Sequence, residues 1–221
     1  MDLSIQQSQG DLLTEAAKSA ARLSPADEML QIFDSELDTA AMADSRGQPI
    51  YRSVKRLSKM IGGEYGNRVI YELLQNAHDA QPDGQGQVSI YLIVRSLEEG
   101  ELLIANGGAG FTRENLDAIR NIASSTKEIG EGIGNKGVGF RSVEALTKDP
   151  RVFSCQGNAR PIDKFDGYCF RLATQDEVEA RMTLLGMGKS AAAVAASMPR
   201  YLATVPVESQ PEHVKAFARE G

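Results

Sequence analysis

Three polar residues, Glu72, Asn76 and Asp79, recur at helical spacing within a segment that also carries leucine and alanine. On a helix that advances about 100° per residue, these positions fall within roughly 60° of one another, so their side chains share one stripe. An asparagine carbonyl is a suitable ligand for Mg²⁺, and a glutamate one turn away can orient or deprotonate water. The alternative is an ordinary amphipathic helix with a solvated polar face.

A second candidate is the loop of residues 106–111, with the sequence NGGAGF, which follows an expected strand. Three glycines in four positions allow the backbone to approach a ligand closely. Asn106, at the end of the strand, has an amide that can hydrogen-bond a planar heterocycle. The same composition is also typical of a tight turn between a strand and a helix.

The third candidate is a glycine-rich segment, residues 130–140, that follows Ser124, Ser125 and Lys127. A glycine-rich loop leading into a helix presents backbone N–H groups that bind phosphates. Lys127 and Lys136 add positive charge. The alternative is a glycine loop that binds no ligand.

Two better-known phosphate motifs do not fit this segment. Gly132, Gly134 and Gly137 match the dinucleotide pattern G-x-G-x-x-G, but no strand precedes them. The P-loop pattern also fails, because Asn135 stands where its second glycine belongs.

The order and spacing of the motifs are more specific than any motif alone. E-x-x-x-N-x-x-D-A, N-G-G-A-G-F, S-S-T-K and G-x-G-N-K-G-V-G-F follow one another within about 70 residues. This order resembles the GHKL ATPase superfamily, which includes DNA gyrase B, the heat-shock chaperone of ninety kilodaltons, histidine kinases and the MutL repair proteins. The likeness is closest to the sacsin-like branch, and it is specific from about residue 68 to residue 153.

The resemblance implies a role for each motif. Glu72 matches the catalytic glutamate that activates the attacking water, Asn76 the magnesium-binding asparagine, and Asp79 a polar support of the pocket. Residues 124–133 correspond to the ATP lid. The other implied nucleotide contacts are Gly108 and Gly110 beneath the adenine, Ser124, Ser125 and Lys127 in the closed lid, and Gly134, Asn135, Lys136, Gly137, Val138, Gly139 and Phe140 at the phosphates.

The sequence departs from the superfamily pattern in two places. Asn106 replaces the aspartate that accepts a hydrogen bond from the adenine amino group. Its amide oxygen can also accept this bond, but it carries no charge, and a rotated amide would present a donor. Members of the superfamily also continue to a later strand, whereas we expect no strand after the last helix and a domain truncated before its final strands.

Composition indicates one domain in a reducing, cytoplasmic environment. The chain has 221 residues, 42% of them apolar, and a net charge of −6, which does not indicate direct nucleic-acid binding. No apolar stretch approaches the roughly 18 residues of a membrane span. The two cysteines, Cys155 and Cys169, show no metal-type spacing and are expected in core strands.

The pattern of elements predicts an α+β fold, a two-layer sandwich of a mixed, mostly antiparallel sheet with helices on one face, plus a helical N-terminal extension. The resemblance specifies a Bergerat-type ATP-binding fold. We expect an extension and linker over residues 1–50 and the ATP-binding domain over residues 51–221. A helix is expected to start at Ser24, and a basic helix is expected over 51–61, ending at two glycines. Further helices are expected over 64–80, from Thr112 to about 122, from the end of the glycine-rich stretch 130–139 to about 146, and over most of the last 45 residues. Strands are expected over 88–94, 102–105, 151–154 and 168–172.

The resulting hypothesis is an ATP-binding domain whose Mg²⁺-dependent hydrolysis of ATP drives conformational change in a larger protein. Its partners would be attached C-terminal domains or protein clients, or a second copy in a homodimer. The alternative is a regulatory switch that binds a nucleotide without hydrolysing it. A sensor histidine kinase is disfavoured, because no histidine precedes the helix of Glu72.

Overall fold

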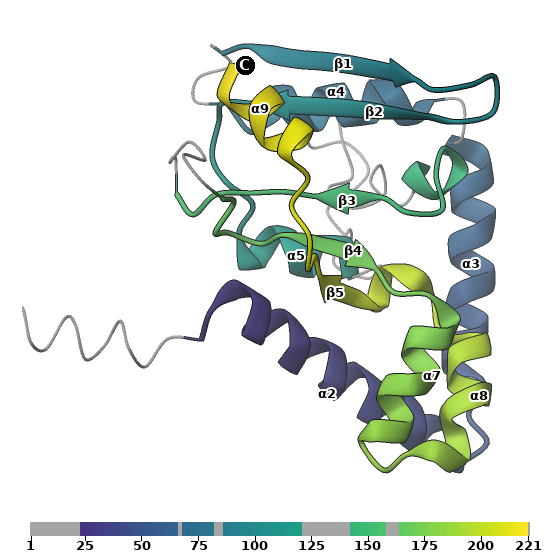
Figure 1. The fold of residues 1–221 in the computed structure, drawn as a ribbon. Coiled ribbons are helices and arrows are strands. Elements are labelled where there is room, and N and C mark those ends of the chain that lie inside the picture. Colours follow the sequence, from purple (N-terminus) through teal and green to yellow (C-terminus); the bar gives the residue numbers. More distant parts are fainter. Residues whose placement is uncertain (1–22, 66–67, 82–85, 121–141, 158–163, 221) are drawn as a thin grey trace, which may run out of the picture.

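The computed structural model describes residues 23–65, 68–81, 86–120, 142–157 and 164–220 (Figure 1). These residues form an α+β fold with two small antiparallel sheets. The helices are α2 (Pro25–Ser45), α3 (Ile50–Tyr65), α4 (Val69–Asp79), α5 (Arg113–Arg120), α7 (Gln175–Leu184), α8 (Gly188–Ser197) and α9 (Glu212–Glu220), with short 3-10 turns η4 (Ser142–Ala145) and η5 (Arg200–Leu202). The strands are β1 (Val88–Val94), β2 (Gly100–Asn106), β3 (Arg151–Val152), β4 (Phe170–Leu172) and β5 (Thr204–Pro206).

The start of α2 follows from its first residues. Ser24 Oγ accepts a hydrogen bond from the backbone N–H of Asp27 at 3.1 Å, and Pro25 occupies the first turn, where its missing N–H is not needed. Met29, Phe33 and Leu37 then face the core at helical spacing. The predicted helix start and apolar side are therefore confirmed.

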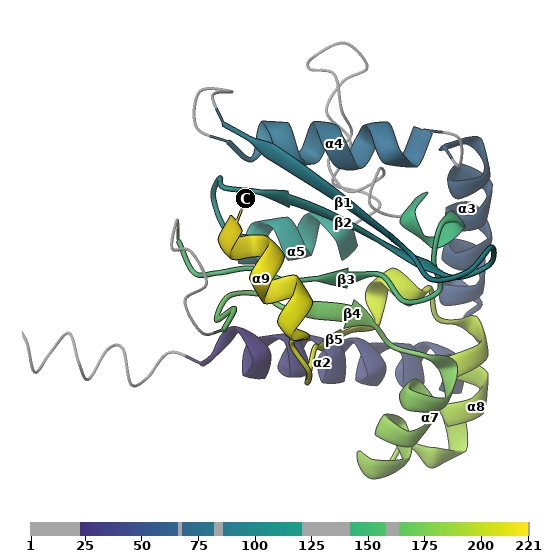
Figure 2. The ribbon, with the colours of Figure 1, turned by 45° about the horizontal axis from the view of Figure 1, so that its top comes forward.

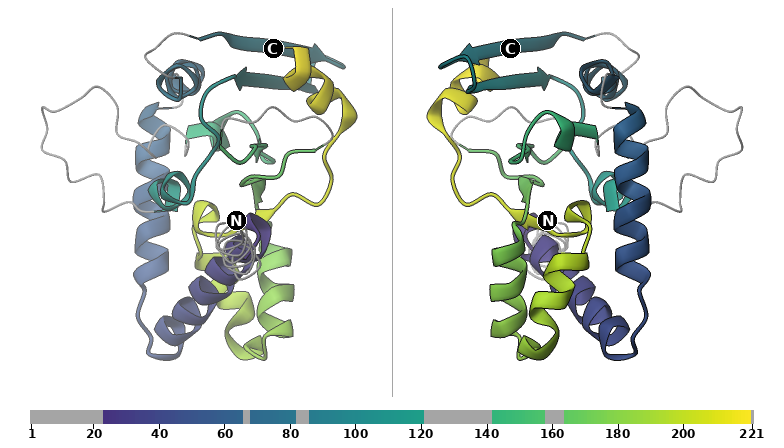
Figure 3. Two further views of the ribbon diagram at one scale, coloured as in Figure 1. Left: turned by 90° about the vertical axis from the view of Figure 1, so that its left-hand side faces the viewer. Right: turned by 90° about the vertical axis from the view of Figure 1, so that its right-hand side faces the viewer.

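The first sheet is the hairpin β1–β2, which confirms the predicted pair of strands. Its register runs from Val88 opposite Asn106 to Val94 opposite Gly100. Helix α4 and helix α9 lie on opposite sides of this hairpin (Figures 1 and 3), and the ring of Tyr91 stacks on that of Phe217 in α9 at a centroid distance of 5.8 Å. The expectation of helices on one face therefore does not hold for the hairpin.

The second sheet has the strand order β3–β4–β5 and shares no strand with the hairpin. The expected single sheet is therefore wrong for the described residues. Strand β5 was also not predicted, because it is three residues long and ends in Pro206, a residue that sheets tolerate mainly at an edge. Pairing with the buried strand β4 holds it in place.

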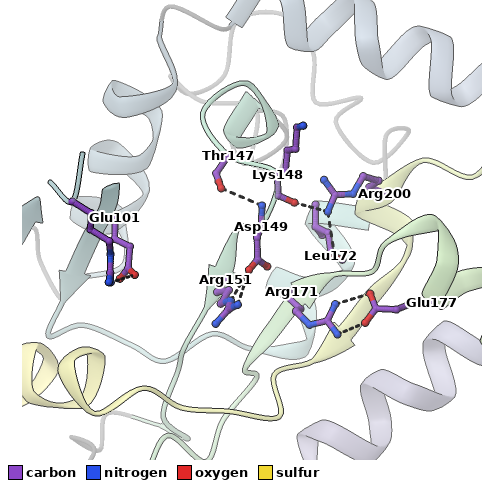
Figure 4. A network of polar contacts seen from close by, with 10 residues as sticks. Glu101, Thr147, Lys148, Asp149, Arg151, Arg171, Leu172, Glu177 and Arg200 are labelled. Carbon is purple, nitrogen blue, oxygen red and sulfur yellow. Dashed lines mark hydrogen bonds and ion pairs between the residues drawn. The ribbon is translucent and has the colours of Figure 1, made fainter. Parts of the chain in front are cut away.

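Polar contacts fasten β4 to its surroundings (Figure 4). The guanidinium of Arg171 binds both carboxylate oxygens of Glu177, and this hydrogen-bonded contact lowers the pKa of Glu177 from 4.5 to about 2. Arg200 donates to the backbone oxygens of Lys148, at 2.7 Å, and Leu172, at 3.3 Å. The end of β4 is thus linked to the start of α7 and to η5.

Two buried apolar clusters share helix α2. One packs α2 against α7 and α8, and the other packs it against α5, β4 and η5 (Figure 2). The principal members are Phe33, Leu37, Met182, Val194 and Met198 in the first cluster and Met29, Leu116, Ile119, Phe170 and Tyr201 in the second. Helix α2, within the segment predicted as an N-terminal extension, therefore contributes to the same core as α5, β4, α7, α8 and η5.

A buried guanidinium connects the two halves of this core. Arg120, at the end of α5, donates to Leu202 O at 2.6 Å, Thr204 Oγ1 at 3.1 Å and Glu36 Oε2 at 2.8 Å. The other oxygen of Glu36 accepts from the hydroxyl of Tyr51 at 2.6 Å. Burial lowers the pKa of Arg120 against the opposing effect of Glu36, and burial together with Glu36 raises the pKa of Tyr51.

Two predicted helix boundaries are wrong. Helix α3 continues through Gly62 and Gly63 to Tyr65, because two glycines weaken a helix without ending it when its neighbours favour the helical backbone. Helix α4 begins at Val69 rather than at Glu64. Across the described residues, no helix is long and apolar enough to span a membrane.

We predict that Arg120→Ala lowers the free energy of unfolding by about 3 kcal/mol, because it removes a buried guanidinium and leaves the half-buried Glu36 carboxylate without this cation. Arg113→Ala is the matched control on the same helix: its ion pairs with Glu28 and Asp117 are more exposed, so the loss should be about 1 kcal/mol or less. Urea unfolding of both variants measures the difference, and equal losses would contradict the role given to Arg120.

Candidate functional site

Helix α4 carries the polar stripe that the sequence predicts. Glu72 is half-buried, and Asn76 and Asp79 are exposed, whereas Ala77 on another side of the helix is buried. His78 Nδ1 lies 3.5 Å from Asp79 Oδ1, and both side chains are more than half exposed, so this contact stabilises little. The stripe is therefore open to solvent at its C-terminal end.

The first glycine loop packs directly on the end of α4. The backbone N–H of Ala109 donates to Ala80 O at 3.0 Å. A Cβ atom at Gly108 would lie only 2.2 Å from that same carbonyl oxygen. Only glycine fits at position 108, and this contact brings residues 106–110 beside the C-terminal end of the polar stripe.

The next glycine of the motif meets a different segment. Gly110 N–H donates to Gly157 O at 2.9 Å, and a Cβ atom at Gly110 would lie 2.0 Å from Cys155 O. By contrast, a Cβ atom at Gly107 would meet nothing within 4 Å. Gly108 and Gly110 are therefore explained by backbone packing within the protein, and Gly107 is the glycine that lies in open space.

Asn106 ends strand β2 and turns its side chain onto the loop. Its Oδ1 accepts a hydrogen bond from Gly108 N–H at 3.0 Å. A carbonyl oxygen has two lone pairs, so this atom can still accept a second bond from a ligand. This bond also means that the amide oxygen of Asn106, rather than its NH₂ group, faces the loop in this conformation.

Two residues that the sequence analysis did not single out also lie against the loop. Gln81 is buried next to Gly108 and donates from Nε2 to Gln87 O at 2.9 Å. Ser154 Oγ accepts from Phe111 N–H at 2.7 Å. Gln81 belongs to a polar turn sequence and Ser154 lies 43 residues from its partner, so no local pattern could have revealed either role.

The structure brings together two of the three sequence motifs, the α4 stripe and the first glycine loop. The third motif and the lid lie outside the described residues. Those predicted site residues are Ser124, Ser125, Lys127, Gly134, Asn135, Lys136, Gly137, Val138, Gly139 and Phe140.

The described residues contain no group of three or more histidine, cysteine, aspartate or glutamate side chains that could hold a metal ion. The two cysteines are buried as free thiols, and burial raises the pKa of each. They belong to a small apolar cluster with Phe165, although neither lies within a strand.

Comparison with known proteins gives one partial match. Protein NO VEIN of Arabidopsis thaliana is 34% identical to this chain over 86 residues. The match covers 38% of this chain and 3% of that protein, so the chain corresponds to a small part of NO VEIN. No family profile matches the chain, and no solved structure matches it.

We predict that Gly108→Ala destabilises the protein by about 1 to 3 kcal/mol, because the new Cβ atom must displace the backbone of Ala80. Gly107→Ala is the matched control in the same loop, where the Cβ atom has open space, and its effect should stay within about 1 kcal/mol. Thermal and urea unfolding measure both variants. Equal destabilisation would show that the loop does not pack on α4 in this way.

Proposed function

We propose that this chain is a GHKL-type ATP-binding module with a Bergerat-type fold, and that it hydrolyses ATP with Mg²⁺ to drive conformational change in a larger protein. The observation that carries the proposal is the hydrogen bond from Ala109 to Ala80. It joins the α4 stripe to the loop of Asn106, so that two motifs of the resemblance meet in space as one nucleotide site would require.

The side chains of α4 suit a magnesium ion that arrives with a nucleotide. Mg²⁺ usually keeps several waters and takes one or two protein oxygens in addition to phosphate oxygens. Asn76 is exposed and would supply one such oxygen, with Asp79 one turn further along the stripe. Bound there, the ion would neutralise phosphate charge.

Glu72 is the proposed general base. It lies one helical turn before Asn76 and is half-buried, so its carboxylate is partly withdrawn from bulk water while remaining accessible. In that position it would orient a water molecule and accept its proton during attack on the terminal phosphate. In a switch that does not hydrolyse ATP, the same site would bind the nucleotide without this step.

Asn106 is the proposed contact to the base. Its amide oxygen, already oriented by the N–H of Gly108, would accept the bond from the adenine amino group. The attached domains or protein clients, the homodimer and the cytoplasmic location remain predictions from the sequence.

We predict that the protein binds a non-hydrolysable ATP analogue with Mg²⁺, and that Glu72→Gln keeps this binding while lowering turnover by about 10²-fold or more. The control Glu179→Gln removes the same charge from an exposed position on α7 and should leave both unchanged. Calorimetric titration and phosphate release measure the two properties. Binding without turnover in the unmutated protein would favour the switch, and no binding at millimolar nucleotide would refute the proposed function.

A second prediction tests the base contact. Asn106→Asp should keep or strengthen adenine-nucleotide binding, because a carboxylate accepts hydrogen bonds more strongly than an amide oxygen. Asn106→Ala should weaken it, because it removes the acceptor and leaves Gly108 N–H without its partner. Titration with ATP and GTP would measure affinity and base preference, and unchanged affinity in both variants would mean that the base binds elsewhere.

A further inference from the structure

A pocket lies between residues 52–59 of α3 and the C-terminal half of α8, with the start of α7 at its edge. Its volume is about 450 Å³, which falls in the range of small-molecule sites. The lining residues are Arg52, Lys55, Arg56 and Lys59 of α3, Gln175 of α7, and Ala193, Ala196 and Ser197 of α8. The pocket is therefore strongly basic on one wall and neutral on the other.

The four cations come from one face of α3. Their spacing of three, four and seven residues puts them in register along the helix, over an axial length of roughly 10 Å. Among the described residues, none of the four forms an ion pair with a carboxylate. Glu144 of η4 interacts electrostatically with Lys55 and Lys59 but pairs with neither.

Lys55 shows how the pocket wall is held. It is half-buried, and its Nζ donates to Ala196 O at 2.7 Å, one of the carbonyls that end α8. Burial, followed by the charge of Lys59, lowers the pKa of Lys55. Lys55 thus offsets the negative end of the α8 dipole, and the exposed Arg52, Arg56 and Lys59 remain as charges that can bind an incoming anion.

The neutral wall keeps the pocket open. Ala193 and Ala196 present only methyl groups, and Ser197 and Gln175 add polar atoms at the border. A multiply charged anion of small volume fits this combination of concentrated charge and limited space. An extended nucleic-acid duplex fits it less well, because the chain has a net charge of −6 and the cations are gathered in one hollow.

We propose that this pocket binds the polyphosphate group of a small phosphorylated ligand, at a site separate from the proposed nucleotide site. The separation follows from the course of the chain: the pocket lies on residues 52–59 of α3, and α4 follows the C-terminal end of that helix (Figure 1). The proposal does not depend on ATP binding at α4.

The test is calorimetric titration of the full chain with tripolyphosphate. Ala193→Glu places a carboxylate into the pocket and should weaken binding by about tenfold or more. Ala192→Glu is the matched control: it is the preceding residue on α8, is also exposed, and lies outside the pocket lining, so the affinity of this variant should stay within about twofold of the unmutated protein. Because both variants carry the same charge and leave α4 untouched, tripolyphosphate bound at α4 would respond equally to both.

A second pair of variants keeps the test valid if Ala193→Glu fails to fold. Arg56→Gln combined with Lys59→Gln should weaken binding, whereas Arg46→Gln combined with Lys164→Gln, which removes two exposed charges elsewhere, should not. Equal effects of pocket and control variants, or no binding at millimolar tripolyphosphate, would overturn the proposal. A nucleic-acid duplex that binds with sensitivity to Ala193→Glu when tripolyphosphate does not would also overturn it.

Discussion

The buried guanidinium of Arg120 is the contact on which the arrangement of elements depends. It binds Glu36 of α2, the backbone of Leu202 and the hydroxyl of Thr204, so three separate parts of the chain meet at one side chain. Such a group is costly to bury unless every donor finds a partner. Because Arg120 ends α5, this requirement also fixes the helix that directly follows the first glycine loop, and it thereby limits where the loop can lie.

Helix α3 connects the two proposed sites. Its residues 52–59 form the basic wall of the pocket, and α4 begins at Val69, with three residues between it and the end of α3. Near its start, Tyr51 is tied to Glu36 and so to the Arg120 contact. The helix is therefore anchored near its start, close to the cations, and it directly precedes the helix that bears Glu72.

Elements with strong local signals could be predicted, and those defined by distant partners could not. The hairpin β1–β2 follows from two apolar runs around a turn, and the start of α2 follows from Ser24 and Pro25. Strand β5 has no such signal: it exists because β4 offers it hydrogen bonds, and its Pro206 argues locally against a strand. The separation of the sheet into two parts is likewise a property of packing that no stretch of sequence contains.

For the candidate site, the sequence pointed to individual residues but did not reveal why the fold requires them. Gly108 and Gly110 fit a nucleotide motif, yet each is required because a Cβ atom would collide with Ala80 or Cys155 backbone. A tight loop on a helix end needs these glycines whether or not a nucleotide binds. The more informative residues are Asn106, whose acceptor retains a second lone pair beside its bond to Gly108 N–H, and the stripe of α4, whose amide is exposed and whose carboxylate is half-buried. Substitutions at these positions, rather than at the glycines, therefore test whether the loop and α4 form a nucleotide site or only a well-packed turn.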